Sequence, residues 1–232
     1  KAKDISKISI LSRKPVKMAD DAKDPRINVI LHDDFGKYDS AVLSKLQGAD
    51  GCVWALGISQ TKVNKDDYVK ITKDYTLHAA EAFATLSTAD QPFRFVYVSG
   101  EGATQTPGRF SAIFARVKGE TEQALADMTS STPSLRADSV RPAYVDASEH
   151  EAVKPYIPDP GRLFKVLATG MSGIISAGFL SGSHSPTPML GSFLTKMAMG
   201  RVPDDKLAAS GAFQLNKSWV VPNVALRKVE GL

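Results

Sequence analysis

Residues 93–118 read FRFVYVSGEGATQTPGRFSAIFARVK, and this stretch decides the fold class. Phe93–Val98 is a largely apolar run of the kind that forms a strand covered on both faces of a parallel sheet. Ser99-Gly100 ends the run, and a helix-like pattern follows after a loop. On that helix Phe114 and Lys118 are four residues apart and therefore share one face. The stretch predicts a strand–loop–helix unit with a serine, a phenyl ring and a lysine near one another.

The same rhythm of strand and helix continues on either side of this unit. The predicted strands are Lys7–Ser12, Asn28–His32, Cys52–Leu56, Phe93–Val98 and Arg136–Arg141. The predicted helices are Tyr38–Leu46, Lys65–Leu86 and Phe114–Met128. Apolar strands alternating with helices predict an α/β fold with a doubly wound, Rossmann-like parallel sheet.

The pattern weakens after residue 145, where prolines and glycines break 146–190 into loops and short helices before a helical period resumes at Met189–Met199. We therefore divide the chain into a Rossmann-like domain, 1–145, and a small C-terminal cap, 146–232, packed on the same sheet. Residues 166–195 carry no charged side chain, but glycines and prolines interrupt them before the ~20 apolar residues of a membrane span are reached. A substrate-side mobile segment, or a surface over 161–180 that contacts a membrane, fits this segment better.

Composition excludes several classes of function. The 232 residues are 43% hydrophobic and 23% charged, and the net charge of +4 is dispersed, so no nucleic-acid-binding surface is expected. Cys52 is the only cysteine, which excludes an internal disulfide, and its apolar surroundings predict a buried, inert thiol. The four histidines lack metal-ligand spacing, so no metal site is expected.

A dinucleotide site of this fold needs a Gly-rich turn between the first strand and the first helix, because the pyrophosphate binds at that helix N-terminus. No such unit precedes Lys7, and Gly100-Glu101-Gly102 lacks a glycine at 105 and follows a late strand. We therefore interpret Lys7–Ser12 as the second strand of the fold, and expect the first strand and its Gly-rich loop upstream of the sequence given. The chain begins with Lys rather than Met, as a processed product, a fragment or the ordered part of a longer protein would.

Two cations follow that second strand. Ser12, Arg13 and Lys14 lie where the adenosine ribose of a dinucleotide would be, and an arginine there accommodates a 2′-phosphate. A guanidinium offers paired donors to phosphate, so NADP(H), with NADPH preferred over NADH, is the expected cofactor. A solvated basic loop is the alternative.

Further candidate cofactor contacts end the later strands: Asp33, Asp34, Leu56, Gly57, Pro142 and Tyr144. An aspartate can meet the adenine amino group, a glycine lets the backbone approach a ribose, and a proline stiffens a loop that contacts the nicotinamide amide. Turn capping by aspartate and simple strand termination by glycine or proline remain open alternatives.

Ser99 and Lys118 are the candidate catalytic residues. The strand–loop–helix unit resembles that of the short-chain dehydrogenases and reductases, in which a lysine holds the nicotinamide ribose and lowers the pKa of a tyrosine phenol from ~10, while a serine orients the carbonyl. Phe114 occupies the tyrosine position and has no proton to give. Ser111 or Tyr144 could replace the missing hydroxyl, and Lys118 could instead be an ordinary exposed helix lysine.

Seven segments, SRKP, HDDF, WALGIS, DYVKITKDYTLHAA, FRFVYVSGEGA, ARVKGETEQAL and RPAYV, together resemble the atypical short-chain dehydrogenase/reductases of the NAD-dependent epimerase/dehydratase type. Within that type the chain resembles the HIV Tat-interacting oxidoreductase-like proteins of fungi and animals, over about residues 5–145. The resemblance implies NADP(H) binding, with Arg13 on the 2′-phosphate, Asp34 on adenine, Ser99 as catalytic serine and Lys118 as cofactor lysine. It also implies a cytoplasmic protein, in some relatives associated with the mitochondrial surface.

Two functions remain open on the sequence. The first is an NADP(H)-binding, short-chain-dehydrogenase-like protein whose carbonyl reductase activity is weakened or lost because of Phe114. Its partners would be the dinucleotide and a small carbonyl substrate. The alternative is a non-catalytic scaffold or regulatory protein that binds partner proteins.

Overall fold

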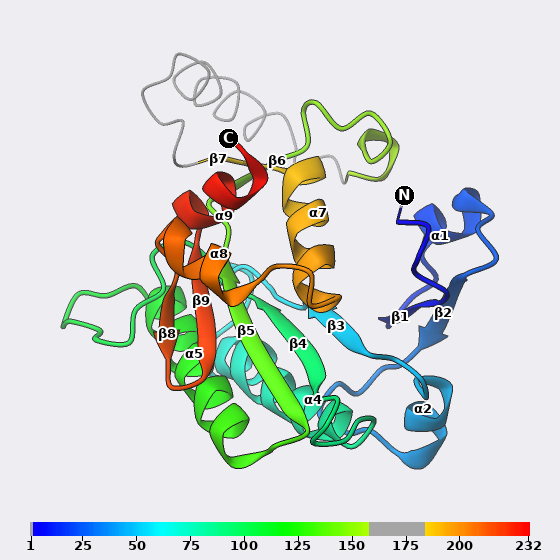
Figure 1. Cartoon of the computed structure of the whole chain (residues 1–232), viewed down its shortest axis with the longest axis horizontal. Helices are drawn as coiled ribbons and strands as arrows, with labels where there is room; N and C mark the ends of the chain where they lie inside the picture. Colours follow the sequence, from blue (N-terminus) through cyan, green and yellow to red (C-terminus); the bar gives the residue numbers. More distant parts are fainter. Residues whose placement is uncertain (1, 158–183) are drawn as a thin grey trace.

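A five-stranded sheet forms the centre of the computed structural model, which describes residues 2–157 and 184–232 (Figure 1). In spatial order its strands are β3 (Gly51–Trp54), β4 (Phe93–Val98), β5 (Leu135–Arg141), β9 (Ser218–Pro222) and β8 (Phe213–Leu215). The first four run parallel and β8 is antiparallel to β9. The predicted α/β fold with a mostly parallel sheet is confirmed.

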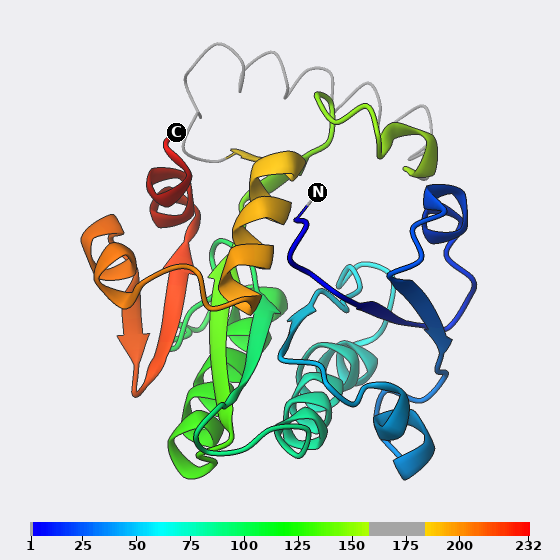
Figure 2. The same cartoon turned by 45° about the vertical axis from the view of Figure 1, so that its right-hand side comes forward.

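A second, two-stranded parallel sheet lies beside the first. β1 (Ile8–Ser12) pairs with β2 (Ile27–Leu31), and the short helix α1 (Lys17–Ala22) connects them. In both views β1 lies on the side of β2 that faces β3 (Figures 1 and 2). No ladder joins β1 to β3 within the described residues, yet Leu11 of β1 packs on the same apolar core as Trp54 of β3.

One layer of helices covers the face of the sheet that bears Phe93, Phe95 and Tyr97. These helices are α2 (Ser40–Lys45), α3 (Lys65–Val69), the π-helical turn η1 (Lys70–Asp74), α4 (Tyr75–Ala84) and α5 (Ile113–Ser131). Successive β4 side chains alternate between the two faces, so Val96 points to the opposite layer. Both faces of β4 are therefore buried, as its apolar run predicted.

Two predicted helices have different limits in the structure. The single helix expected over Lys65–Leu86 is interrupted at η1, where the Thr76 hydroxyl donates to the Thr72 carbonyl oxygen (2.7 Å), a side-chain bond that bends helices. The helix expected from Tyr38 begins at Ser40, because the Asp39 carboxylate accepts a hydrogen bond from the Val42 N–H (2.8 Å) and caps it.

The opposite layer consists of α7 (Thr187–Ala198), α8 (Asp204–Ser210) and α9 (Asn223–Glu230) (Figure 2). Its core joins Val140 of β5 and Val221 of β9 to Phe193 and Leu226 on the helices. The helical period predicted at Met189–Met199 corresponds to α7.

The C-terminal part of the chain contributes strands to the central sheet as well as a covering layer. β9 enters beside β5, and the buried carboxylate of Asp138 accepts a hydrogen bond from the Trp219 N–H (2.8 Å) at this junction. Two short strands, β6 (Tyr144–Asp146) and β7 (His184–Pro186), pair with each other, and a 3₁₀ turn, η2 (Lys154–Tyr156), follows β6. The division into 1–145 and 146–232 stays a prediction.

The segment suggested for membrane contact, 161–180, lies outside the described residues, as does most of 166–195. Among the helices that the structure describes, none has the length and apolar character needed to cross a bilayer.

Candidate functional site

The structure brings Ser99 and Lys118 together at the carboxyl end of β4. The Lys118 ammonium, on α5, donates to the carbonyl oxygens of Ser99 (2.7 Å) and Val98 (3.3 Å). It also lies 5.6 Å from the centre of the Tyr97 ring, within the range of a cation–π contact. The lysine is thus drawn into the site and is not an ordinary exposed helix lysine.

The surroundings of Lys118 change its acidity. Burial lowers the pKa of Lys118 to about 8, and the negative charge of Glu122 partly opposes this effect. Beside it the Ser99 side chain is only 5% exposed, and its hydroxyl has no hydrogen-bond partner among the described residues. A buried hydroxyl without a partner is costly, so this oxygen is available to a ligand group that can bond to it.

Phe114 lies in the first turn of α5, where its backbone N–H donates to the Gln60 side chain (3.1 Å). Its ring is directed at Gly102, where an added Cβ would be 3.6 Å from two ring carbons. Neither hydroxyl suggested as a substitute shows a contact with Lys118. Ser111 accepts from the Gly108 N–H (2.9 Å), and Tyr144 is 40% exposed on β6.

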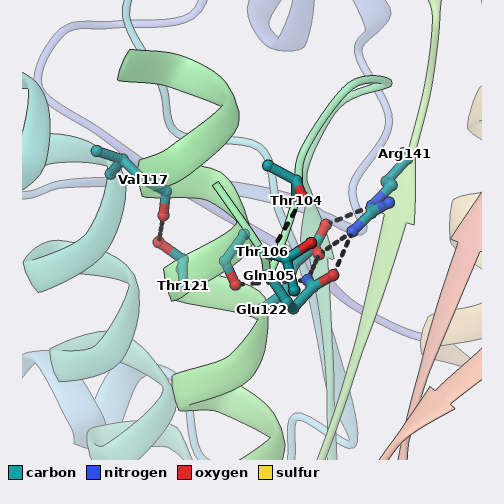
Figure 3. Close-up of polar contacts among 8 residues, drawn as sticks. Thr104, Gln105, Thr106, Val117, Thr121, Glu122 and Arg141 are labelled. Atoms are coloured by element: carbon teal, nitrogen blue, oxygen red, sulfur yellow. Dashed lines mark hydrogen bonds and ion pairs between the residues drawn. The ribbon is translucent and has the colours of Figure 1, made fainter. Parts of the chain in front are cut away.

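A buried polar cluster joins the loop after β4 to α5 and β5 (Figure 3). Arg141 at the end of β5 binds both carboxylate oxygens of Glu122, with its Nε at 2.9 Å from Oε1 and a terminal nitrogen at 2.6 Å from Oε2. The Gln105 amide donates to Glu122 (2.5 Å) and accepts from Arg141 (3.2 Å). At Gly119 the loop touches the helix so closely that a Cβ would lie 1.9 Å from the Thr104 carbonyl oxygen.

Four of the residues predicted to bind the adenosine end of a dinucleotide meet in a separate surface hollow. Ser12, Arg13, Lys14 and Leu56 line this hollow of ≈340 Å³ together with Leu11 and Phe35. The side chains of Arg13 and Lys14 are exposed, as an anion-binding role or a solvated basic loop requires. Next to Gly57 an added Cβ would meet nothing within 4 Å, so the backbone there is open to approach.

Asp33 and Asp34, predicted to contact the adenine, do not line this hollow. Asp34 accepts a hydrogen bond from the Gly36 N–H (2.9 Å), which is the turn-capping geometry, and it lines a second hollow of ≈390 Å³ with Lys70, Tyr75 and His78 among others. Asp33 is exposed. The geometry favours turn capping for Asp34, and the adenine contact of both aspartates stays a prediction.

Pro142 and Tyr144 also separate. Pro142 is buried, and its carbonyl oxygen accepts from the Glu101 N–H (2.9 Å), which joins the loop after β4 to the end of β5. Tyr144 pairs with His184 in the β6–β7 ladder. Their proposed contacts with the nicotinamide half stay predictions.

Two other sequence predictions concern reactive groups. Burial raises the pKa of the Cys52 thiol, in agreement with an inert cysteine. Within 2–157 and 184–232 no three histidine, cysteine or acidic side chains are grouped as metal ligands would be.

Sequence reasoning missed Gln60, Gln105 and Glu122. Glu122 carried a signal, since it follows Lys118 by four residues on the same helix face, but that spacing usually indicates a solvated ion pair. Gln60 and Gln105 lie in loops without a pattern, so only the folded chain shows that they reach α5 and the cluster.

Comparison with known proteins finds two relatives from fungi. No family model matches the chain. It is 41% identical over 157 residues to the botcinic acid biosynthesis cluster B protein 16 of Botryotinia fuckeliana, a match that spans 67% of this chain and 98% of that protein. It is also 34% identical over 172 residues to the leucinostatins biosynthesis cluster protein T of Purpureocillium lilacinum. That match spans 66% of this chain and 61% of the longer relative.

Solved structures share the fold. A gluconate 5-dehydrogenase from Burkholderia cenocepacia, solved with NADP and tartrate, has a TM-score of 0.59 at 12% identity, covering 93% of this chain and 84% of its own. A small-chain dehydrogenase solved with NADPH has a TM-score of 0.53 at 12% identity, covering 96% of this chain and 99% of its own. The chain therefore has the Rossmann-like fold of short-chain dehydrogenase/reductases.

Proposed function

We propose that this chain, which belongs to the family of the botcinic acid cluster protein 16, is an NADP(H)-binding protein of the short-chain-dehydrogenase type. The carrying observation is that Ser99 and Lys118 meet at the end of β4 although Phe114 has replaced the acid. The names of both relatives support a role in the biosynthesis of a fungal secondary metabolite.

The residues present suit the two ends of such a cofactor. Arg13 and Lys14 offer cationic donors for a 2′-phosphate at the hollow after β1. At the other end the Lys118 ammonium could hold the nicotinamide ribose. The buried Ser99 hydroxyl has no hydrogen-bond partner among the described residues, and a ligand group could supply one. NADPH, when bound, would supply a hydride.

The reaction that this site supports is carbonyl reduction with impaired proton delivery. Ser99 would orient the carbonyl oxygen, the hydride would add to the carbonyl carbon, and the oxygen would then need a proton to become an alcohol. A tyrosine at 114 would supply that proton, but a phenyl ring cannot. A water molecule or another hydroxyl must supply it instead, and the activity is therefore weak or absent.

We further propose that a strand and Gly-rich loop from an upstream segment complete the cofactor site between β1 and β3. The supporting observation is that β1 and β3 are both edge strands of parallel sheets and share one apolar core. Val53 is a large apolar side chain left exposed on the edge strand β3, as a missing βα unit would leave it. An intact mass of the natural protein about 3–4 kDa above the given chain, the mass of about half of a βαβ unit, would agree with this completion.

The closer relationship to the Tat-interacting oxidoreductase-like proteins of the epimerase/dehydratase type is part of the same proposal and rests on the seven segments alone. A cytoplasmic location, with contact to the mitochondrial surface, is proposed on the same basis.

A titration of the natural full-length protein with NADPH and NADH tests the cofactor proposal, with the fluorescence of Trp54 and Trp219 as the signal. We expect saturable binding that favours NADPH and weakens in Arg13→Ala. Lys217→Ala is the matched control, because it removes one exposed cation from the β8–β9 turn, at the far edge of the sheet from β3. Equal weakening by both substitutions would show a general charge effect and contradict the assigned site.

The alternative, a non-catalytic scaffold, is favoured by the same replacement of the acid and by the absence of a Gly-rich loop from the described residues. It predicts that a folded natural protein, with an intact mass equal to that of the 232 residues, binds neither dinucleotide. That pair of results would redirect the search to protein partners.

A further inference from the structure

Lys118 and Glu122 do not form the ion pair that their spacing favours. They lie one turn apart on α5, where a lysine and a glutamate four residues apart normally attract each other. In the structure the ammonium turns to the carbonyl oxygens of Val98 and Ser99, and both carboxylate oxygens turn to Arg141. Another group must therefore hold the Glu122 carboxylate away from the Lys118 ammonium.

The Arg141 guanidinium competes with the Lys118 ammonium for the Glu122 carboxylate. Its paired donors match a carboxylate in a geometry that an ammonium cannot reproduce, and the bonds measure 2.9 and 2.6 Å (Figure 3). Glu122 is 1% exposed and the Arg141 side chain 11%, so the pair is shielded from water. Gln105 completes the arrangement by donating to Glu122 and accepting from Arg141.

We propose that Glu122, Arg141 and Gln105 are positioning residues for Lys118. By holding the Glu122 carboxylate toward β5, the cluster keeps that carboxylate from pairing with the ammonium and leaves the ammonium directed at the end of β4.

The same cluster also holds the atoms that Lys118 contacts. Gln105 donates weakly to the Gly119 carbonyl oxygen (3.5 Å), and the Thr104 N–H donates to the Ala115 carbonyl oxygen (3.0 Å), so the loop that begins at Ser99 is fastened to α5. Loosening the cluster would therefore both free a carboxylate and release the carbonyl acceptors of Lys118.

The other groups around Lys118 do not replace this function. Tyr97 on β4 presents its ring to the ammonium, and Tyr68 on α3 is near enough to raise the pKa of Tyr97. Burial raises the pKa of both phenols, so they are neutral near pH 7. Glu101, in the same loop, is turned to the Asn223 N–H (3.3 Å). Glu122 is therefore the carboxylate that decides the charge next to Lys118 among the described residues.

The test follows the titration of Lys118 itself by the ¹³Cε chemical shift in ¹³C-lysine-labelled protein, with the signal assigned by its loss in Lys118→Met. Arg141→Met should free Glu122 and raise the apparent pKa of Lys118 by about one unit, as a newly paired charge does. The double variant Glu122→Gln with Arg141→Met should abolish that rise. Lys70, an exposed lysine over Tyr75, should give the same ¹³Cε signal in all variants and is the internal control.

If the cluster were purely structural, Arg141→Met would leave the Lys118 titration as it is in the parent chain, and that result would overturn the proposal. If Arg141→Met does not fold, Arg141→Lys decides, because it keeps the charge and removes the paired donors. An unchanged Lys118 titration in folded Arg141→Lys would equally overturn it. The readout needs no dinucleotide, so a failure of the proposed cofactor binding leaves this result independent.

Discussion

Replacing Lys118 by methionine should change how stability depends on pH. The folded chain holds Lys118 at a pKa of about 8 because the ammonium is buried, whereas the ordinary value is 10.5. Between these two values the unfolded chain binds more protons than the folded chain, so the free energy of unfolding rises with pH. Below about pH 8 both states are protonated at this site and the full cost of burying the charge remains.

The size of the effect follows from the two pKa values. Each pH unit between them contributes about 1.4 kcal/mol, so Lys118 should add about 2 kcal/mol to the free energy of unfolding between about pH 7 and about pH 9.5. Lys118→Met has no such group. At pH 7 it should also be more stable than the parent chain, because a flexible apolar side chain replaces a buried ammonium.

Urea unfolding at several pH values, followed by tryptophan fluorescence, measures both effects. The useful quantity is the difference between the parent chain and Lys118→Met, because the titrations of Cys52 and Tyr97 occur in both proteins and cancel. A flat difference over this pH range would refute the reasoning and show that Lys118 is solvated. Lys70→Met, at an exposed position, should give a difference that does not vary with pH.

Three further predictions concern the same region and its surroundings. Phe114→Tyr should raise NADPH-dependent carbonyl reduction in the natural full-length protein, and an unchanged rate with intact cofactor binding would mean that the pocket does not use a phenol. Gly119→Ala should destabilise the chain by about 2–3 kcal/mol, since its Cβ would collide with Thr104, whereas Gly191→Ala, in open space on α7, should stabilise it by about 0.5–1 kcal/mol in the same urea assay. Cys52 should react with a thiol reagent more slowly in the folded chain than in the urea-unfolded chain, because burial raises the pKa of its thiol, and equally fast labelling of both would contradict this.

Apolar runs were sufficient to predict β1 to β5 and the α/β class, because burial on both faces leaves few choices of residue in a strand such as β4. They could not predict where β9 enters the sheet, since this five-residue strand is specified by contacts with β5 and Asp138 that are distant in sequence. The same distinction holds for the site. Ser99 and Lys118 could be predicted to lie together because they belong to one strand–loop–helix unit. The contact between Arg141 and Glu122 could not be predicted, because it depends on the pairing of β5 with β4.

The arrangement around Lys118 bears on the choice between a binding protein and a scaffold. A buried ammonium with a lowered pKa and a buried Ser99 hydroxyl without a described partner both reduce stability. In a scaffold that only presents its surface, these two destabilising groups would have no function. In a ligand-binding site they would have one, because a ligand can bond to the hydroxyl and the ammonium that the fold leaves incompletely satisfied. Phe114 has no proton to donate, but the ammonium and the hydroxyl are both present, so the arrangement favours the proposed cofactor-binding protein over the scaffold.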